Sequence, residues 1–314
     1  MKVLVSDGIE KVGSDLLKNA GIEVVVCEKT PSPEELLKEI NKYDAIIVRS
    51  ATKVTKEVID AGTNLKAIGR GGVGVDNIDV AYAHSKGIPT LNTPGASSIS
   101  VAELAIAHMF AVARFLNTSS AEMKAGKWPK KEYAGGVELT GKTLGLLGFG
   151  NIGRETAKRA LGLGMKVIAF DPFFKNPDNL DVKSVSKDEV LANADYISLH
   201  LPLIKGEPVP VAAPEFEKMK KGVIIINCAR GGVVDEPALL SALNSGKVAA
   251  AGLDVFVNEP ITDAQKELIA HPRVSATPHI GAATNEAQDR VGVEIAHKIA
   301  EAIKNKNVID PIMK

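Results

Sequence analysis

Three side chains of complementary chemistry, Arg230, Glu259 and His279, each stand shortly after an apolar run in the second half of the chain. Histidine titrates nearest neutral pH and suits the removal of a proton from an alcohol. A carboxylate hydrogen-bonded to the ring orients it and favours its charged form. A guanidinium carries a fixed charge and matches the geometry of a substrate carboxylate. This set is typical of hydride transfer at a 2-hydroxy acid.

Each of the three residues also has a simpler explanation when it is taken alone. A histidine at a strand end is often a surface residue, a glutamate before proline can cap a helix or turn, and an arginine can pair with a surface acid. The position that they share favours catalysis, because the preceding runs 223–227, 250–254 and 274–277 read as parallel strands. The carboxyl ends of parallel strands meet at one rim of a sheet, where ligands bind.

A glycine motif in the same half indicates the hydride acceptor. Gly148, Gly150 and Gly153 fit G-x-G-x-x-G between an apolar strand and a helical segment, and Asp171 ends the next strand. Glycines permit the tight turn, the close approach of a pyrophosphate and the packing of helix on strand. The helix start then holds the phosphates. Asp171 would accept hydrogen bonds from ribose hydroxyls and repel a 2′-phosphate, so we expect NAD rather than NADP; the alternative is a plain tight turn.

The residues just after the other strands of this half complete the predicted cofactor site. They are His200, Leu201 and Pro202 after the third strand, Cys228 and Ala229 after the fourth, Asp254 after the fifth and Gly281 after the sixth.

The same glycine spacing recurs earlier in the chain with a different context. The run 69–74 also follows an apolar strand, but the next strand ends in Asn92 rather than an acid, and Asp76 and Asp79 stand where a pyrophosphate would bind. We therefore expect this loop to approach another group. Its amides at Gly72 and Val73 can bind a carboxylate as a nest.

Two arginines at neighbouring strand ends accompany this second glycine loop. Arg49, followed by Ser50, ends the third strand of the first half, and Arg70 begins the loop. They suggest that the substrate carries a second anionic group, such as a phosphate. Surface ion pairs are the alternative.

Composition limits the class of protein. The length of 314 residues predicts about two domains. Aromatic residues make up only 4%, so the cores are aliphatic, which suits helices packed on parallel strands. With 38 basic and 38 acidic residues, nothing indicates a nucleic acid or a membrane surface as partner. Two isolated cysteines and no ligand cluster give no sign of a disulfide framework or a metal site. The start reads as a strand rather than a signal peptide, so we expect a cytoplasmic protein.

Alternating strand and helix patterns divide the chain into two α/β series. The first series has five strands and ends near residue 95, and the second has six strands from residue 143. Between them, residues 97–116 read as a buried apolar helix opened by a Ser100/Glu103 capping box. An amphipathic helix at 285–304 then returns to the first series. We expect a nucleotide-binding domain at 97–284 inserted into a substrate domain formed by 1–96 and 285–314.

The chain resembles the D-isomer-specific 2-hydroxyacid dehydrogenases along nearly its whole length. The segments that carry the resemblance are 48–55, 74–79, 92–94, 148–154, 227–232, 253–256, 259–260 and 278–282. The resemblance implies a Rossmann NAD-binding domain inserted into a flavodoxin-like substrate domain, and Arg230, Glu259 and His279 as the active-site trio with His279 as acid/base. It also implies a homodimer built on the nucleotide domain. Implied cofactor contacts are Val73, Asn151, Ile152, Asp171, Leu201, Cys228, Arg230, Asp254, His279 and Gly281.

Within the family, the run 48–55 is most similar to members that oxidise 3-phospho-D-glycerate, the entry to serine synthesis. In these members Arg49, Ser50 and Arg70 fall at substrate-holding positions. One alternative is a glyoxylate or hydroxypyruvate reductase on the same scaffold. Another, of a different class, is an NAD-sensing module as in corepressors of this fold, which fold alone does not exclude.

Some residues depart from the family pattern. Leu201 stands where phosphorylated-substrate members often have threonine, and a proline-rich stretch at 206–214 replaces a polar one. The segment that follows Trp128 lacks an arginine that relatives carry and reads Pro129, Lys130 and Lys131 instead. The sequence ends at Lys314, so the resemblance leads us to expect no C-terminal regulatory domain and no feedback by serine.

Overall fold

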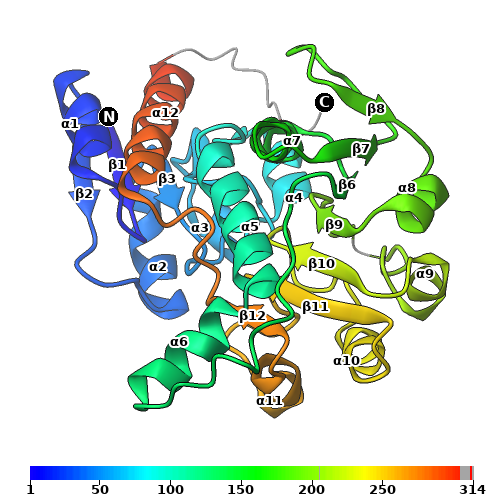
Figure 1. The fold of residues 1–314 in the computed structure, drawn as a ribbon. Helices are drawn as coiled ribbons and strands as arrows, with labels where there is room; N and C mark the ends of the chain where they lie inside the picture. The colour runs from blue at the N-terminus through cyan, green and yellow to red at the C-terminus, as the bar shows by residue number, and fades with distance from the viewer. Residues whose placement is uncertain (205, 305–311, 313–314) are drawn as a thin grey trace. The chain divides into compact units, whose positions relative to one another are not determined.

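A computed structural model of the chain describes residues 1–204, 206–304 and 312. The fold divides into two compact units (Figure 1). The first, which we call the discontinuous unit, comprises Met1–Ser97 and Ala282–Lys314, and the second, the central unit, comprises Ser98–Gly281.

The discontinuous unit is built on a five-stranded parallel sheet. Its order, β2-β1-β3-β4-β5, is the flavodoxin order of a doubly wound fold. Because helices cover both faces, the strands are short aliphatic runs, and β3 is buried along its whole length. The strands are β1 (Lys2–Val5), β2 (Glu23–Val26), β3 (Ala45–Val48), β4 (Ala67–Arg70) and β5 (Thr90–Asn92).

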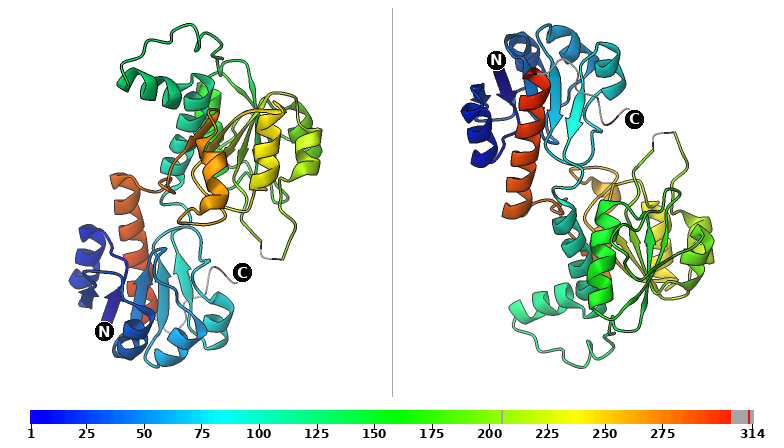
Figure 2. Two further views of the ribbon diagram at one scale, coloured as in Figure 1. Left: turned by 90° about the horizontal axis from the view of Figure 1, so that it is seen from below. Right: turned by 90° about the horizontal axis from the view of Figure 1, so that it is seen from above.

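Alternate side chains of this sheet enter two separate cores, as the period of two in a strand requires. Ile46 and Ile68 pack under α2 (Pro33–Glu39), η1 (Ile40–Lys42), α3 (Lys56–Ala61) and α4 (Val80–Ser85). Ala45 and Ile47 pack under α1 (Lys11–Asn19) and α12 (Asn285–Lys304), which lie side by side in both views of Figure 2. The helix expected at 285–304 is thus present and joins the first sheet.

The central unit contains a seven-stranded parallel sheet in the order β12-β11-β10-β9-β6-β7-β8. The first six strands in chain order follow the Rossmann arrangement, so the expected fold class is confirmed. The expectation of six strands was one short, because the brief strand β8 adds to the edge beside β7. The strands are β6 (Thr143–Leu147), β7 (Lys166–Phe170), β8 (Val182–Ser184), β9 (Tyr196–Leu199), β10 (Val223–Asn227), β11 (Val248–Leu253) and β12 (Val274–Ala276).

Helices cover both faces of the central sheet. One face packs against α5 (Ser98–Ala113) and α7 (Asn151–Gly162), and the other against α8 (Lys187–Asn193), α9 (Ala213–Lys218), α10 (Glu236–Asn244) and α11 (Asp263–Ala270). Because both faces are covered, all five residues of β10 are buried.

The apolar helix expected at 97–116 is shorter than the pattern indicated. It ends at Ala113, because Phe115 adopts a left-handed φ of 54° and contacts the ring of Tyr133 at a centroid distance of 5.7 Å. A second helix, α6 (Leu116–Lys124), follows in a stretch for which no helix was expected. The Ser100/Glu103 capping box was also wrong: Ser100 donates to the carbonyl of Gly281, and Glu103 pairs with Arg159.

Across the described residues, no individual helix meets the length and hydropathy needed to cross a membrane. The bent pair α5 and α6 meets them jointly, on length and composition alone.

Candidate active site

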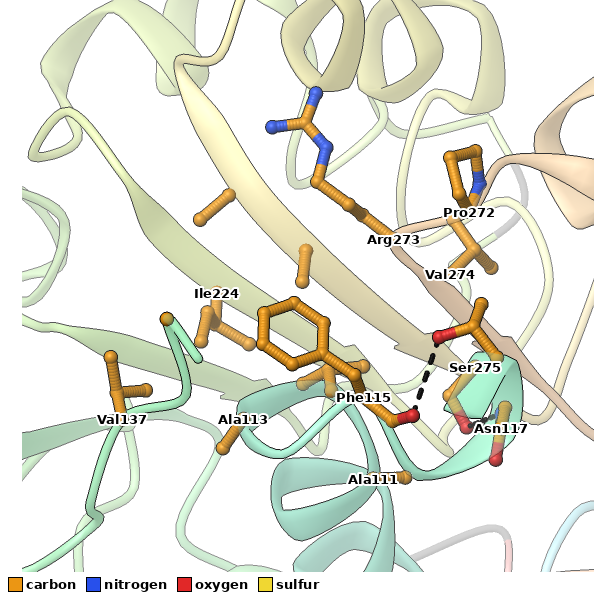
Figure 3. Close-up of a pocket in the computed structure, with 15 residues that line it drawn as sticks. Ala111, Ala113, Phe115, Asn117, Val137, Ile224, Pro272, Arg273, Val274 and Ser275 are labelled. Carbon is orange, nitrogen blue, oxygen red and sulfur yellow. Dashed lines mark hydrogen bonds between the residues drawn. The ribbon is translucent and has the colours of Figure 1, made fainter. Parts of the chain in front are cut away.

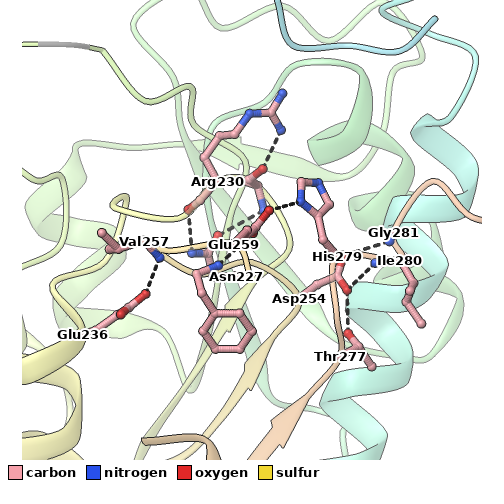
Figure 4. Close-up of polar contacts among 12 residues, drawn as sticks. Asn227, Arg230, Glu236, Asp254, Val257, Glu259, Thr277, His279, Ile280 and Gly281 are labelled. Atoms are coloured by element: carbon pink, nitrogen blue, oxygen red, sulfur yellow. Dashed lines mark hydrogen bonds and ion pairs between the residues drawn. The ribbon is translucent and has the colours of Figure 1, made fainter. Parts of the chain in front are cut away.

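Arg230, Glu259 and His279 follow three adjacent strands of the central sheet. The strands β10, β11 and β12 are neighbours and parallel, so their carboxyl ends deliver the following loops to one edge. In Figure 4 the Arg230 guanidinium and the His279 ring extend to the same side, and the Glu259 carboxylate is directed at the ring. The structure therefore brings together the three residues that the sequence singled out.

The imidazole of His279 is hydrogen-bonded to Glu259. Its Nδ1 lies 2.6 Å from Glu259 Oε2, while Glu259 Oε1 accepts from the backbone N–H of Phe256 at 3.0 Å. A carboxylate only accepts hydrogen bonds, so Nδ1 carries the proton and Nε2 keeps its lone pair. The His279 side chain is 47% exposed, and this Nε2 is thus suited to exchange a proton with a bound substrate.

The buried carboxylate of Asp254 organises the turn that holds His279. His279 has a left-handed φ of 54°, which a non-glycine residue adopts only when its surroundings hold it there. Asp254 Oδ1 accepts from the N–H of Ile280, and Oδ2 accepts from the N–H of Gly281, each at 2.8 Å. The Asp254 carbonyl accepts from the N–H of His279 at 2.8 Å. Asp254 was expected to contact the cofactor, and its side chain supports the histidine turn in the structure.

Arg230 is placed by a turn that Asn227 closes at the end of β10. Asn227 Oδ1 accepts from the N–H of Ala229, and its Nδ2 donates to the Arg230 carbonyl, each at 3.0 Å. A Cβ at Gly231 would lie 1.8 Å from the Phe256 carbonyl oxygen, so only glycine lets this turn pack against the loop after β11. The Arg230 Nη1 donates to the carbonyl of Ala229 at 2.7 Å.

The glycine loop after β6 fits a dinucleotide phosphate. Gly148 has a φ of 98°, and a Cβ there would lie 2.4 Å from the His200 carbonyl oxygen. A Cβ at Gly153 would lie 2.4 Å from the Gly148 carbonyl oxygen. Gly150 is the N-cap of α7, no side chain caps the helix, and a Cβ there would meet open space. The helix start, with Asn151 and Ile152 as its first residues, is thus open to an anion.

Asp171 lies beside this loop at the end of β7. Its Oδ2 accepts from the N–H of Phe149 and its Oδ1 from the N–H of Phe173, both at 2.7 Å. Each carboxylate oxygen can accept more than one hydrogen bond, so lone pairs remain for two ribose hydroxyls. The negative charge held here opposes a 2′-phosphate.

His200 lies beneath the glycine loop as a neutral imidazole. Burial lowers its pKa to about 4. The Nε2 contacts the Ser198 hydroxyl at 3.0 Å, and the buried Nδ1 makes no hydrogen bond with the described residues. Leu201 is half-buried against the core, and Pro202 is exposed.

The residues at the end of β10 have different exposures. Cys228 is buried, and its burial, aided by the nearby charge of Asp254, raises the pKa of the thiol. Cys228 is therefore a packing residue and not a nucleophile. Ala229 is half-buried.

The discontinuous unit carries the two other arginines at adjacent strand ends. Val48 of β3 pairs in register with Arg70 of β4, so Arg49 directly follows the paired position. A Cβ at Gly71 would lie 3.0 Å from the Arg49 side chain, and one at Gly72 would meet the Arg70 guanidinium. Both arginines thus lie over the same glycine loop, and the anion site that the sequence suggests there stays a prediction.

Arg49 is largely buried, and burial lowers the pKa of its guanidinium against the opposing charges of Asp7 and Glu10. Its Nη1 donates to Gln288, while its Nε makes no hydrogen bond with the described residues. The neighbouring Ser50 is exposed. This unit therefore presents a buried cation with an unused donor.

Gly72 and Val73 form the loop beyond Arg70. Gly72 has a φ of 147°, a conformation that favours glycine, and the Val73 carbonyl accepts from Asn92 Nδ2 at 2.6 Å. These residues belong to the discontinuous unit, whereas every other residue predicted to bind the cofactor belongs to the central unit.

Sequence reasoning missed the polar residues that shape the Arg49 loop. Asp7 accepts from the N–H of Arg49 at 2.7 Å and from that of Thr52 at 2.9 Å. Asn77 Nδ2 donates to the carbonyls of Arg49 and Thr52 at 2.9 and 2.6 Å. The position of Asp7, two residues after the first strand, was a usable signal, whereas Gln288 on α12 carried none.

One pocket lies elsewhere on the central unit. It has a volume of about 260 Å³ and is lined by residues of α5 and α6, by the early residues of β10 and β11, and by β12 (Figure 3). The trio instead follows the carboxyl ends of these strands. Within the described part of the chain, no group of histidine, cysteine and acidic side chains is placed to hold a metal ion.

Comparisons with known proteins agree with this geometry. The family model "D-isomer specific 2-hydroxyacid dehydrogenase, NAD binding domain" matches residues 106–281. The chain is 52% identical to a hydroxypyruvate reductase of Thermotoga maritima, over 95% of this chain and 97% of that protein. It is 47% identical to a D-3-phosphoglycerate dehydrogenase of Archaeoglobus fulgidus, over 97% of this chain and 58% of that protein. A solved glyoxylate reductase of Paecilomyes thermophila superposes with a TM-score of 0.89 at 34% identity, covering 100% and 99% of the two chains.

The chain belongs to the D-isomer-specific 2-hydroxyacid dehydrogenase family. It is accordingly an NAD-dependent oxidoreductase that acts on 2-hydroxy acids, which confirms the expected cofactor. The chain spans about three-fifths of the length of the Archaeoglobus phosphoglycerate dehydrogenase that it matches.

Proposed function

We propose that the protein oxidises 3-phospho-D-glycerate to 3-phosphohydroxypyruvate with NAD, the reaction that opens serine synthesis. The observation that carries the proposal is the pair Arg49 and Arg70 over one glycine loop. A buried guanidinium with an unused Nε donor suits a strongly charged ligand group, and arginine matches phosphate oxygens in pairs of hydrogen bonds. D-glycerate, the acid without the phosphate, has only one anionic group, for which Arg230 already suffices.

Residues of the central unit supply the proton chemistry. His279 Nε2 accepts the proton of the C2 hydroxyl, while Glu259 stabilises the charge that the ring gains. Arg230 binds the substrate carboxylate and polarises the C2 oxygen. NAD, when bound, accepts the hydride that leaves C2, so the alcohol loses one proton and one hydride and becomes a ketone. In the reverse direction His279 returns its proton to the C2 oxygen.

The cofactor-binding residues divide by the part of NAD that each suits. Gly148, Gly150, Asn151, Ile152 and Gly153 suit the pyrophosphate, and Asp171 suits the adenosine ribose. His200, Leu201, Pro202, Cys228, Ala229, Asp254 and Gly281 line the sheet edge on which the nicotinamide would rest, and Val73 belongs to the substrate unit. Ser50 and Gly72 supply further donors toward the substrate.

A second candidate activity is the reduction of hydroxypyruvate. The Thermotoga relative named for this activity is 52% identical and matches this chain over 97% of its own length. Hydroxypyruvate differs from the proposed product only in lacking the phosphate. The two candidates therefore share the trio and differ in whether Arg49 and Arg70 bind a phosphoryl group.

Initial rates with matched substrate pairs test the proposal. NAD reduction is followed with 3-phospho-D-glycerate and with D-glycerate, and NADH oxidation with 3-phosphohydroxypyruvate and with hydroxypyruvate. We expect kcat/KM to favour the phosphorylated member of each pair. Preference for hydroxypyruvate would overturn the proposal in favour of the second candidate.

The Arg49→Ala variant makes the test specific to the phosphate. We expect it to lower kcat/KM for the phosphorylated acid by roughly 10- to 100-fold, the worth of one charged hydrogen bond, and to change that for the unphosphorylated acid little. Lys38→Ala, which removes an exposed charge of the same unit, is the control and should leave both values unchanged. Equal losses for the two acids in Arg49→Ala would contradict a phosphate role.

We also infer a homodimer, in the cytoplasm, formed through the region of α5 and α6. The helix α6 buries none of its residues within the chain, Leu116 and Met123 are about half exposed, and Trp128 is 77% exposed. Such a concentration of exposed large apolar residues is typical of a subunit interface. Light scattering should give twice the 33.1 kDa chain mass, and a Trp128→Ser/Met123→Ser variant should shift the mass toward one chain. A monomeric parent protein would contradict this inference.

A further inference from the structure

A histidine outside the trio, His108, lies buried between α5 and the central sheet. It is 2% exposed, and a Cβ at Gly252 of β11 would lie 2.5 Å from the His108 Cβ. Glycine at 252 therefore creates the space in which the imidazole lies against the sheet. Ser275, the register partner of Gly252 on β12, contacts the ring directly.

Both ring nitrogens of His108 are hydrogen-bonded to hydroxyl groups near the active-site loop. Nδ1 lies 2.9 Å from Ser275 Oγ, and Nε2 lies 3.1 Å from Thr277 Oγ1. Thr277 Oγ1 in turn lies 2.6 Å from Asp254 Oδ1. On the other side, Asn117 Nδ2 donates to Ser275 Oγ at 2.8 Å. Five side chains thus form one continuous chain that ends at the carboxylate holding the His279 turn.

The direction of every proton in this chain follows from its two ends. The carboxylate of Asp254 accepts only, so the Thr277 hydroxyl donates to it and must accept from His108 Nε2–H. Burial lowers the pKa of His108 despite the opposing charge of Asp254, which leaves the ring neutral with one proton. Nδ1 is then the acceptor, and the Ser275 hydroxyl donates to it while accepting from the Asn117 amide. No donor or acceptor in the chain is left in conflict.

We propose that His108 is a positioning residue for the catalytic histidine. Its Nε2–H orients the Thr277 hydroxyl, which fills one acceptor site of Asp254. Asp254 then holds the backbone of residues 279–281 with its remaining acceptor sites. This inference rests on the proposed role of His279, but it applies to whichever 2-oxo acid the protein reduces.

Two pairs of variants test the positioning role. His108→Gln retains an N–H that can donate to Thr277, whereas His108→Met fills similar space without a hydrogen bond. We expect His108→Met to lower kcat by about tenfold, the low end of the loss seen when hydrogen-bond partners that orient metal-bound histidines are removed. His108→Gln should keep kcat within about threefold, and KM for NADH should change little in both. Equal kcat in His108→Met and the parent, or equal losses in both variants, would overturn the proposal.

Thr277→Val and Thr277→Ser provide the same comparison if His108→Met folds poorly, as judged by its thermal unfolding. Serine keeps the hydroxyl, and valine keeps the shape. Loss of kcat in the valine variant alone supports the chain of hydrogen bonds, whereas an unchanged kcat in Thr277→Val contradicts it.

Nitrogen NMR of ¹⁵N-histidine-labelled protein gives a readout that does not depend on activity. The His108 signal, assigned by its loss in His108→Gln, should show an unprotonated Nδ1 and a protonated Nε2 at pH 7.5. The opposite tautomer or a cationic ring would overturn the proposal. Because this result is independent of substrate, failure of the proposed reaction and failure of the positioning role are distinguishable.

Discussion

His279 Nδ1 lies 2.6 Å from Glu259 Oε2, although the two residues are supplied by loops after different strands. The contact selects the tautomer in which Nε2 carries no proton. In the proposed mechanism, in which Nε2 is the base, it also positions a negative charge where the ring becomes positive during proton transfer. Two substitutions separate these contributions.

Replacing His279 with Gln should abolish proton transfer but preserve the fold. General acid–base catalysis contributes roughly 10²- to 10⁴-fold, so we expect kcat to fall within that range. Titration of the variant with NADH, followed by fluorescence, should give a Kd within about twofold of the parent, since the glycine loop is untouched. Turnover retained at the parental rate would exclude His279 as the acid/base.

Glu259→Gln keeps the size of the side chain and removes its charge. The amide can still hydrogen-bond to the ring, but it no longer stabilises an imidazolium. We expect kcat to fall by less than in His279→Gln, at roughly 10- to 100-fold. A loss larger than that of the histidine variant would show that Glu259 has another role.

Asp171 should determine the preference for NAD over NADP. Its loss removes ribose hydrogen bonds and the repulsion of a 2′-phosphate. We expect Asp171→Ala to lower the ratio of kcat/KM for the two cofactors by roughly 10- to 100-fold. Asp181→Ala removes an exposed charge nearby in sequence and serves as the control. Parity of the two cofactors in the parent protein would contradict the assignment.

The half-buried His200, whose Nδ1 is fully buried, should make stability depend on pH. Its pKa is about 4 in the fold and about 6.5 when unfolded, so the unfolded chain binds more protons between these values. The free energy of unfolding should therefore be highest above pH ~6.5 and fall by about 3 kcal/mol as the pH approaches 4. Urea unfolding at several pH values measures this slope.

His200→Gln should flatten that slope, because the titrating ring is gone. His297→Gln, at an exposed position on α12, is the matched control and should retain the parental slope. The contribution of His108 has the same sign and is common to all three proteins. Identical slopes in His200→Gln and the parent would show that His200 does not titrate as its burial requires.

Gly252→Ala tests the close packing around His108. The added methyl would lie 2.5 Å from the His108 Cβ, and overpacking of this kind costs about 1–3 kcal/mol. Gly162→Ala, at the end of α7, meets nothing within 4 Å and should leave stability unchanged or raise it by up to about 1 kcal/mol. Chemical denaturation distinguishes the two variants, and equal stabilities would contradict the packing argument.

The sequence was informative where function depends on residues close together in the chain. Gly148, Gly153 and Asp171 belong to one βαβ unit. Arg230 and His279 each follow a strand that its aliphatic pattern identifies. Because the carboxyl ends of parallel strands lie at one edge of the sheet, the expectation of a parallel sheet was enough to predict that these residues lie near one another. The end of α5 was not predictable in the same way, because the apolar pattern continues past Ala113 while the turn at Phe115 depends on packing with Tyr133.

Residues whose contacts depend on strand register or on the packing of distant helices could not be predicted from the sequence either, because these contacts are set by tertiary structure. The pairing of Gly252 with Ser275 and the position of His108 against them depend on how α5 lies on the sheet. Gln288 reaches Arg49 only because α12 returns to the first sheet. The contacts of His108 with Gly252 and of Gln288 with Arg49 join residues more than a hundred positions apart, and no local pattern encodes them.

The division of the chain into two units has a consequence for how such an enzyme can diversify. Arg230, Glu259, His279, Asp254 and the glycine loop all belong to Ser98–Gly281, while Arg49 and Arg70 belong to the other unit. If Arg49 and Arg70 bind the substrate as proposed, mutations in the discontinuous unit can change which acid is recognised while the hydrogen bonds that hold His279 and the glycine loop stay intact. On this proposal, substrate selectivity can change through mutations in the discontinuous unit, while the central unit keeps the residues for the redox step.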